Sequence, residues 1–171
     1  MKSNIALIGF MGAGKSTVGK ALAAAAGMDF VDLDTMIEEK AERSISEIFA
    51  SDGEPTFRRM EATIVNDAAC RENTVIACGG GVILDQANIV ALRRNTFIIY
   101  LQAEPSVLLR RVLKSRDKRP LLLVFDPATA MDDLLKYREP LYKAAADLTV
   151  NTSALDIDGA VQKILAEIGK K

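Results

Sequence analysis

The segment GFMGAGKST, residues 9–17, follows directly on the apolar run IALI at residues 5–8. It matches the pattern G-x-x-x-x-G-K-[ST], whose glycines let the backbone bend so that successive N–H groups face a chain of phosphates. The N-terminus of the helix expected after the loop adds its dipole at the same place. The segment therefore predicts a nucleotide site; the alternative is an ordinary glycine turn between a strand and a helix with an incidental lysine.

Within this loop we expect Lys15 to reach the β- and γ-phosphates and the Ser16 hydroxyl to ligate Mg²⁺. The Asn-Lys-x-Asp element that guanine-specific proteins usually carry does not occur in the sequence, so we expect ATP rather than GTP. The predicted nucleotide contacts from the loop are Gly12, Ala13, Gly14, Lys15, Ser16 and Thr17.

The composition is that of an ordinary globular domain. At 171 residues the chain is most simply a single domain, large enough to bury roughly 70% of its unfolded surface. Its net charge of −1 provides no overall field that would attract nucleic acid or an acidic membrane. The chain has no histidine, and Cys70 and Cys78 lack metal-ligand spacing, which argues against a zinc site and an imidazole base.

No stretch approaches the ~20 apolar residues of a membrane helix, and the apolar run at the N-terminus is too short for a secretory signal. We therefore expect a cytoplasmic protein. No exposed apolar stripe stands out, and we expect a monomer without nucleic-acid or membrane partners.

Apolar runs alternate with helical patterns along the whole chain. Such alternation predicts a three-layer α/β fold, a central five-stranded parallel sheet with helices on both faces. Strands are predicted at residues 5–9, 29–34, 74–78, 96–101 and 148–150, and helices at 15–26, 35–43, 45–51, 57–70, 86–93, 106–114, 131–143 and 157–168. A break is expected at residues 53–55, and residues 116–127 are polar and punctuated by proline.

Several polar motifs follow the predicted strands, at the rim where parallel sheets bind ligands. Asp32 and Asp34 are expected to share one face of the second strand because side chains alternate there. In one division of roles Asp32 helps to hold hydrated Mg²⁺, and Asp34 accepts a hydrogen bond from the hydroxyl group that receives phosphate. The alternative is a pair of solvated aspartates at a strand end.

Arg58 and Glu61 lie three residues apart, so a helix would place them side by side. A guanidinium held by a carboxylate is an oriented fork for a carboxylate on a ligand, whereas the alternative is a surface ion pair of little energy. The triplet at Gly79–Gly81 suits close approach of a ligand to the backbone, or else is a plain turn.

These motifs occur in an order that resembles the shikimate kinase family over nearly the whole chain. The fragments that carry the resemblance are GFMGAGKSTVGKALA, FVDLD, SISEIF, GEPTFRRME, VIACGGG, RPLL and REPLY. The resemblance implies a P-loop fold like that of nucleoside monophosphate kinases, here a single kinase domain over 1–171. It also implies a shikimate-binding region at about 34–61 and a lid at about 112–127. The implied reaction moves the γ-phosphoryl of ATP to the 3-hydroxyl of shikimate, a step of chorismate and aromatic amino acid biosynthesis.

Site roles carried over from the family concern both substrates. On the shikimate side the resemblance implies that Asp34 binds hydroxyls and takes the proton, and that Arg58 and Arg138 grip the carboxylate. Phe49 and Phe57, which sequence alone would place in the core, would line the pocket together with the Gly80 and Gly81 backbone.

On the ATP side, Arg119 of the lid motif would close over the phosphates, and Lys15 would share the catalytic role with it and with Asp34. Arg111, or its neighbour Arg110, would stack on adenine, and the loop Asn151–Leu155 would flank the base largely through its backbone. One departure is the Ala41–Ser44 segment, AERS, which lacks the glycine that this family often has before x-Ser-Ile.

Two other functions remain open from the sequence. A different small-molecule kinase of the same architecture, such as a gluconate or nucleotide kinase, is expected to lack the combined FRxxE, GGG and RPLL elements. A non-catalytic nucleotide-binding module would keep the loop without turnover.

Overall fold

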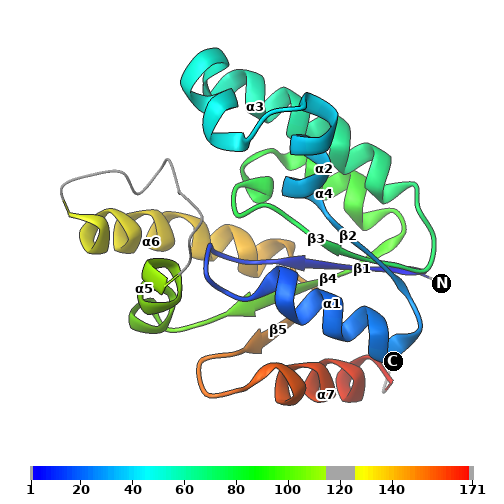
Figure 1. Cartoon of the computed structure of the whole chain (residues 1–171). Helices are drawn as coiled ribbons and strands as arrows, with labels where there is room; N and C mark the ends of the chain where they lie inside the picture. The colour runs from blue at the N-terminus through cyan, green and yellow to red at the C-terminus, as the bar shows by residue number, and fades with distance from the viewer. Residues whose placement is uncertain (1, 115–125, 170–171) are drawn as a thin grey trace.

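The chain forms an open parallel sheet with helices on both sides (Figure 1). The computed structural model describes residues 2–114 and 126–169. The strands within these residues are β1 Asn4–Ile8, β2 Asp29–Asp32, β3 Thr74–Ala77, β4 Thr96–Gln102 and β5 Leu148–Asn151. The helices are α1 Lys15–Ala26, α2 Leu33–Ala41, α3 Ile45–Ala69, the 3-10 turn η1 Val82–Leu84, α4 Gln86–Arg93, α5 Pro105–Lys114, α6 Pro127–Ala145 and α7 Ile157–Ile168.

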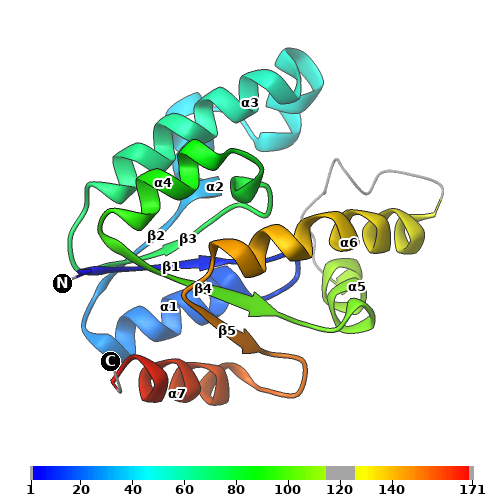
Figure 2. The same ribbon diagram turned by 180° about the vertical axis from the view of Figure 1, so that it is seen from behind.

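The sheet order is β2-β3-β1-β4-β5, and all its pairings are parallel. This confirms the predicted five-stranded α/β fold. Figures 1 and 2 show α1 and α7 on one face of the sheet and α4 and α6 on the other. Because the strands are parallel, the loops after β1, β2, β3 and β5 leave the sheet at the same edge.

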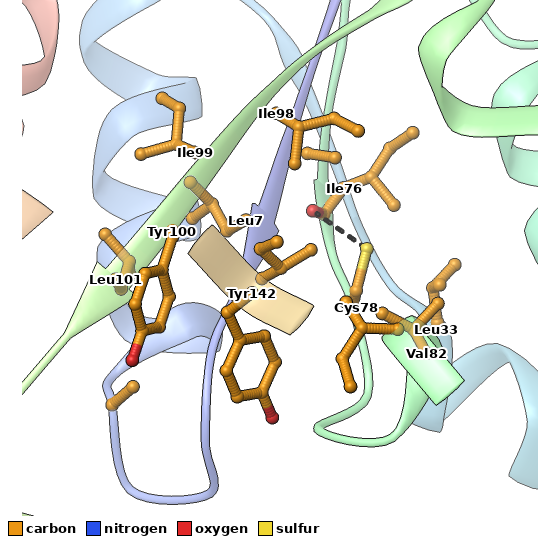
Figure 3. Close-up of a cluster of buried hydrophobic side chains, with 14 of the residues drawn as sticks. Leu7, Leu33, Ile76, Cys78, Val82, Ile98, Ile99, Tyr100, Leu101 and Tyr142 are labelled. Carbon is orange, nitrogen blue, oxygen red and sulfur yellow. Dashed lines mark hydrogen bonds between the residues drawn. The ribbon is translucent and has the colours of Figure 1, made fainter. Parts of the chain in front are cut away.

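The centre of the sheet is the most deeply buried part of the molecule. Every residue of β1 is buried, and Ala6, Leu7 and Ile8 have no exposed surface. Leu7 packs in a cluster with Ile76 of β3 and Ile98 of β4, as Figure 3 shows. A strand buried on both faces must be apolar throughout, which is why residues 5–8 show no polar alternation.

Several helix ends differ from the sequence prediction for a local reason. The prediction of Asp34 on a strand is wrong, because β2 ends at Asp32, whose side chain caps α2 by accepting the Asp34 N–H at 3.0 Å. Asp34 therefore lies in the first turn of a helix. Similarly, α6 begins at Pro127 rather than residue 131, since Asp126 accepts backbone N–H groups of the first turn.

The predicted break near residue 53 is present as a kink inside α3. Gly53 has φ 77° and ψ 167°, a backbone conformation that favours glycine, and Pro55 follows it. Residues 115–125, which include most of the predicted lid and Arg119, lie outside the described residues. None of the helices in the described segments is long and apolar enough to cross a membrane.

A buried side chain ties the start of β1 to the start of β3. Asn4 is 1% exposed, donates from Nδ2 to the Arg71 carbonyl at 2.5 Å, and accepts the Thr74 N–H on Oδ1 at 3.0 Å. We predict that Asn4→Ala lowers the free energy of unfolding by about 2 kcal/mol, because the buried Thr74 N–H loses its acceptor and the Arg71 carbonyl, which Asn95 also contacts at 3.4 Å, loses its shorter hydrogen bond. Asn66→Ala, which removes an exposed amide from α3, should change it by less than about 0.5 kcal/mol. Urea denaturation of both variants measures the difference, and equal effects would contradict this account of Asn4.

Candidate active site

The loop after β1 wraps around the N-terminus of α1 and forms the floor of a cavity of about 590 Å³, which we call the loop cavity. Gly12 has φ 80°, and a side chain there would lie 2.9 Å from the Leu108 carbonyl oxygen. Lys15 donates to the carbonyls of Gly9 at 2.9 Å and Phe10 at 3.0 Å, so its ammonium group lies inside the curve of the loop. The lining from the loop consists of residues 11–18.

Two hard oxygen donors meet at the mouth of this cavity. Ser16 Oγ donates to Asp32 Oδ2 at 2.5 Å, and Asp32 Oδ1 holds the Asp34 N–H. A hydroxyl and a carboxylate are donors that Mg²⁺ prefers, and their shared position fits the ion. Among the described residues there is no cluster of three or more His, Cys, Asp or Glu side chains for a metal. Mg²⁺ would therefore complete its coordination with water and phosphate oxygens.

The far wall of the loop cavity comes from α5 and the segment after β5. Arg111 donates to the Thr152 carbonyl at 3.1 Å and lies 3.4 Å from the Gly12 carbonyl. Leu155 lines the same wall, whereas Arg110 is exposed and is not part of the lining. Of the two arginines proposed for the adenine side, Arg111 is the one that lies in the cavity.

A second cavity, of about 830 Å³, opens beside the first and is lined by Arg58 and Arg138; we call it the arginine cavity. Arg58 donates to Glu61 at 2.8 Å and to Glu54 at 2.9 Å and 3.2 Å. These contacts fix the plane of its guanidinium group. Burial opposes the positive charge of Arg58, but Glu61 and Glu54 outweigh it and raise the Arg58 pKa.

Glu61 has an unusual position for a carboxylate. It is 1% exposed, and its Oε1 has no hydrogen-bond partner within the part of the chain that the structure describes. Burial raises the pKa of Glu61, although the charge of Arg58 opposes this shift. A buried acid whose charged form is disfavoured costs stability, and such groups are concentrated at functional sites.

The other walls of the arginine cavity are aromatic and backbone groups. The rings of Phe49 and Phe57 lie 4.8 Å apart, and both residues line the cavity. Phe57 also belongs to the hydrophobic core, so it is both a core residue and part of the cavity wall. Arg138 is 4% exposed and lies 3.4 Å from the Gly80 carbonyl. A side chain at Gly81 would overlap the Arg58 guanidinium, so glycine here leaves room for that group.

The two cavities meet along a shared wall. Residues that line both are Met11, Ser16, Asp32, Asp34 and Gly80. A side chain at Gly79 would lie 2.9 Å from Asp34 Oδ1 and 3.0 Å from Glu61 Oε1, so this glycine makes space for the two carboxylates. Ligands in the two cavities would therefore lie next to each other, with the Asp34 side chain and the Gly80 backbone beside both.

All the predicted site residues that lie within the described part of the chain line one of the two cavities. Arg119 lies outside it. The expected strand face shared by Asp32 and Asp34 is absent, as described above, but the helix cap brings both carboxylates to the same wall. Cys78 and Tyr142 are among the residues near the site to which the sequence assigns no role.

Both lie in fragments that carry the family resemblance, Cys78 in VIACGGG and Tyr142 in REPLY, but neither is assigned a role of its own. Thr152, in the loop predicted to flank adenine, lines the loop cavity and accepts from Arg111 on its carbonyl. Cys78 lines the loop cavity, and burial raises the pKa of its thiol far above the usual range, so that it stays protonated and is a poor nucleophile.

The parallel sheet has the strand order β2-β3-β1-β4-β5, and its phosphate-binding loop opens beside a cavity lined by two arginines. Together these features define a P-loop small-molecule kinase. The family model for shikimate kinase matches residues 11–169. The chain belongs to the shikimate kinase family.

Similar proteins support this assignment. The chain is 45% identical over 162 residues to a shikimate kinase of Caldanaerobacter subterraneus subsp. tengcongensis, which covers 95% of this chain and 94% of that protein. The shikimate kinase of Acinetobacter baumannii, solved in complex with shikimate, is 39% identical with a TM-score of 0.94, and the match covers 98% of this chain and 93% of that one. A gluconokinase from Sinorhizobium meliloti, 19% identical with a TM-score of 0.61 over 99% of this chain and 93% of that one, shares the fold alone.

The raised pKa of Glu61 predicts a pH-dependent effect on stability. Because the folded state holds the Glu61 proton more tightly than the unfolded state, the stability that this proton provides is present at low pH and lost as the pH rises through the folded pKa. We therefore expect Glu61→Gln to become more stable relative to the wild type as the pH rises from about 4 to 7, the range that starts near the ordinary carboxyl pKa. Urea denaturation at several pH values measures this difference.

Glu54→Gln is the matched control, since it removes the other carboxylate from the same guanidinium. The Glu54 side chain is 47% exposed, so its ion pair contributes little and no such gain is expected. A Glu61→Gln difference that stays flat or shrinks with rising pH would show that the Arg58 pair outweighs burial.

Proposed function

We propose that this chain transfers the γ-phosphoryl group of ATP to the 3-hydroxyl of shikimate and releases ADP and shikimate 3-phosphate. The observation that carries the proposal is the shared wall of the loop and arginine cavities. Phosphoryl transfer depends mainly on in-line positioning and on stabilisation of charge, and two adjoining cavities would let donor and acceptor lie close together.

The arginine cavity suits an acceptor that is both anionic and rich in hydroxyl groups. Arg58 and Arg138 supply guanidinium groups for a carboxylate, and the paired glutamates hold Arg58 in place without filling its cavity. The backbone of Gly80 and Gly81 offers polar groups to ring hydroxyls at close range. Phe49 and Phe57 provide an apolar wall for the ring itself.

Asp34 is the group that we place at the reacting hydroxyl. It lines both cavities and lies beside the space left by Gly79. In the proposed reaction the 3-oxygen of shikimate forms a bond to the γ-phosphorus while the bond from that phosphorus to the β,γ-bridging oxygen breaks. Asp34 accepts the hydroxyl proton, and ADP leaves with the electron pair of the broken bond.

The loop cavity holds the donor. Lys15 and the loop N–H groups balance the charge of the phosphates, with Ser16 and Asp32 as the residues that would hold Mg²⁺. When bound, the ion would supply positive charge that offsets the negative charge of the phosphates. Arg111 and Leu155 would contact adenine. Arg119 would add a further positive charge at the phosphates when the lid at about 112–127 closes.

The same proposal includes the wider setting of the enzyme. We infer a monomer of the cytoplasm that acts in chorismate and aromatic amino acid biosynthesis, with no nucleic-acid or membrane partner. The net charge of −1 supports the absence of a polyanionic partner.

A coupled assay of ADP release from Mg²⁺-ATP tests the acceptor. The purified chain is given shikimate, gluconate, AMP or no acceptor. ADP release that depends on shikimate supports the proposal. Activity with gluconate or AMP alone would keep the kinase class and overturn the acceptor, and ATP binding without turnover would indicate a nucleotide-binding module.

We predict that Asp34→Asn keeps ATP affinity within about twofold but lowers kcat by about 10²-fold or more, because a positioned general base contributes that much to proton transfer. Asp67→Asn, which changes an exposed aspartate paired with Lys40 on α2, should leave both unchanged. Steady-state kinetics and ATP titration measure the two quantities. An Asp34→Asn variant with near wild-type kcat would show that Asp34 is not the proton acceptor.

A further inference from the structure

Tyr142 is a buried residue next to the site for which the proposed reaction has no role. It lies on α6 with no exposed surface, one helical turn after Arg138. Its hydroxyl donates to the Gly80 carbonyl, the same oxygen that Arg138 approaches at 3.4 Å. Two side chains of one helix thus converge on the glycine that both cavities share.

The Tyr142 ring is held by a second tyrosine. The rings of Tyr142 and Tyr100 are stacked with centroids 5.0 Å apart and an interplanar angle of 16°. Figure 3 shows the two rings side by side with both hydroxyl groups pointing the same way. Tyr100 pairs with Ile8, the last residue of β1 before the phosphate-binding loop. The stack therefore rests on the centre of the sheet, which fixes the direction of the Tyr142 hydroxyl.

Gly80 also lies next to the phosphate-binding loop. A side chain at Gly80 would lie 3.6 Å from the Met11 nitrogen and 3.7 Å from the Gly9 carbonyl oxygen, and 3.8 Å from the Tyr142 hydroxyl. The Gly80 backbone is thus a neighbour both of the loop predicted to hold the donor and of the tyrosine on α6. A small shift of this backbone would change the spacing of the two cavities.

Arg138 depends on the same neighbourhood. Its Nε is buried and has no partner among the described residues, and its NH1 contact with Gly80 is long. Burial raises the pKa of the Tyr142 phenol, while Arg138 opposes the rise, so the hydroxyl stays protonated and remains a donor throughout the physiological range.

We propose that Tyr142 is a positioning residue of this enzyme, which holds the Gly80 carbonyl and the Arg138 guanidinium in the geometry that receives the acceptor. The inference rests on the proposed function, since it takes the arginine cavity as the shikimate site. Tyr142 does not touch the substrate in this account. It acts through Gly80 and Arg138, so it affects the binding of the acceptor rather than the binding of ATP.

Tyr142→Phe tests the proposal because it removes the hydroxyl and keeps the stacked ring. We expect the KM for shikimate to rise about tenfold, the fold-change that corresponds to one buried hydrogen bond, with kcat lowered by no more than about threefold. The KM for ATP should change by less than about twofold. A tyrosine that served only to stabilise the fold would not produce this split.

Tyr100→Phe is the matched control, since it removes the other hydroxyl of the same stack and should leave all three constants within about twofold of the wild type. Wild-type constants for Tyr142→Phe, or an equal rise of both KM values, would overturn the proposal. Failure of the proposed function is a different result, because then the wild type itself would show no shikimate-dependent ADP release.

A measurement on the wild type covers the case in which Tyr142→Phe does not fold. The chain has three tyrosines, so ¹³Cζ-tyrosine labelling gives three signals, and the variants Tyr100→Phe and Tyr137→Phe assign them by elimination. Saturating shikimate should shift the Tyr142 signal more than saturating ADP does. Shikimate binding, measured by calorimetry on the same sample, without a shift of the Tyr142 signal would contradict the proposal.

Discussion

A parallel strand that is buried on both faces can offer polar backbone to a ligand only beyond its carboxyl end, and β1 imposes this constraint on the whole molecule. Residues 5–8 of β1 are apolar, and the strand is buried between β3 and β4. The loop that holds phosphate and the glycine triplet must therefore leave the sheet side by side. Their proximity follows from strand order, and the two cavities meet at Gly80 for the same reason.

The site contains features that a fold optimised for stability alone would avoid. Glu61 is buried with its pKa raised, and Arg138 is buried with an Nε that has no hydrogen-bond partner among residues 2–114 and 126–169. Each costs folding free energy, and each lies against the cavity that we assign to shikimate. The gluconokinase neighbour has the same fold, so the sheet alone does not distinguish acceptors. We attribute the choice of acceptor to these charged groups, whose burial is unfavourable for folding.

Much of this architecture was predictable because local and tertiary preferences agree. Residues 5–8 are all apolar, which is typical of a strand buried on both faces. The motif after them is typical of one structure, a phosphate-binding loop between a strand and a helix. Asp34 was misplaced on a strand since Asp-x-Asp fits both a strand face and a helix cap, and only packing chooses the cap. Tyr142 lies in the fragment REPLY, which carries part of the family resemblance, but the sequence assigns it no role, because an aromatic residue in an amphipathic helix is normally core. Its role follows from contacts with Tyr100 and Gly80, which are distant in the chain.

In the proposed reaction the γ-phosphoryl group of ATP passes, where the two cavities meet, to one particular hydroxyl of shikimate. The position of the phosphate on the product therefore tests the proposal. Two-dimensional ³¹P–¹H NMR of the product formed from Mg²⁺-ATP and shikimate reports which ring proton couples to phosphorus. We expect coupling to the proton on carbon 3. Coupling at another carbon, or inorganic phosphate as the sole new phosphorus signal besides ADP, would contradict it.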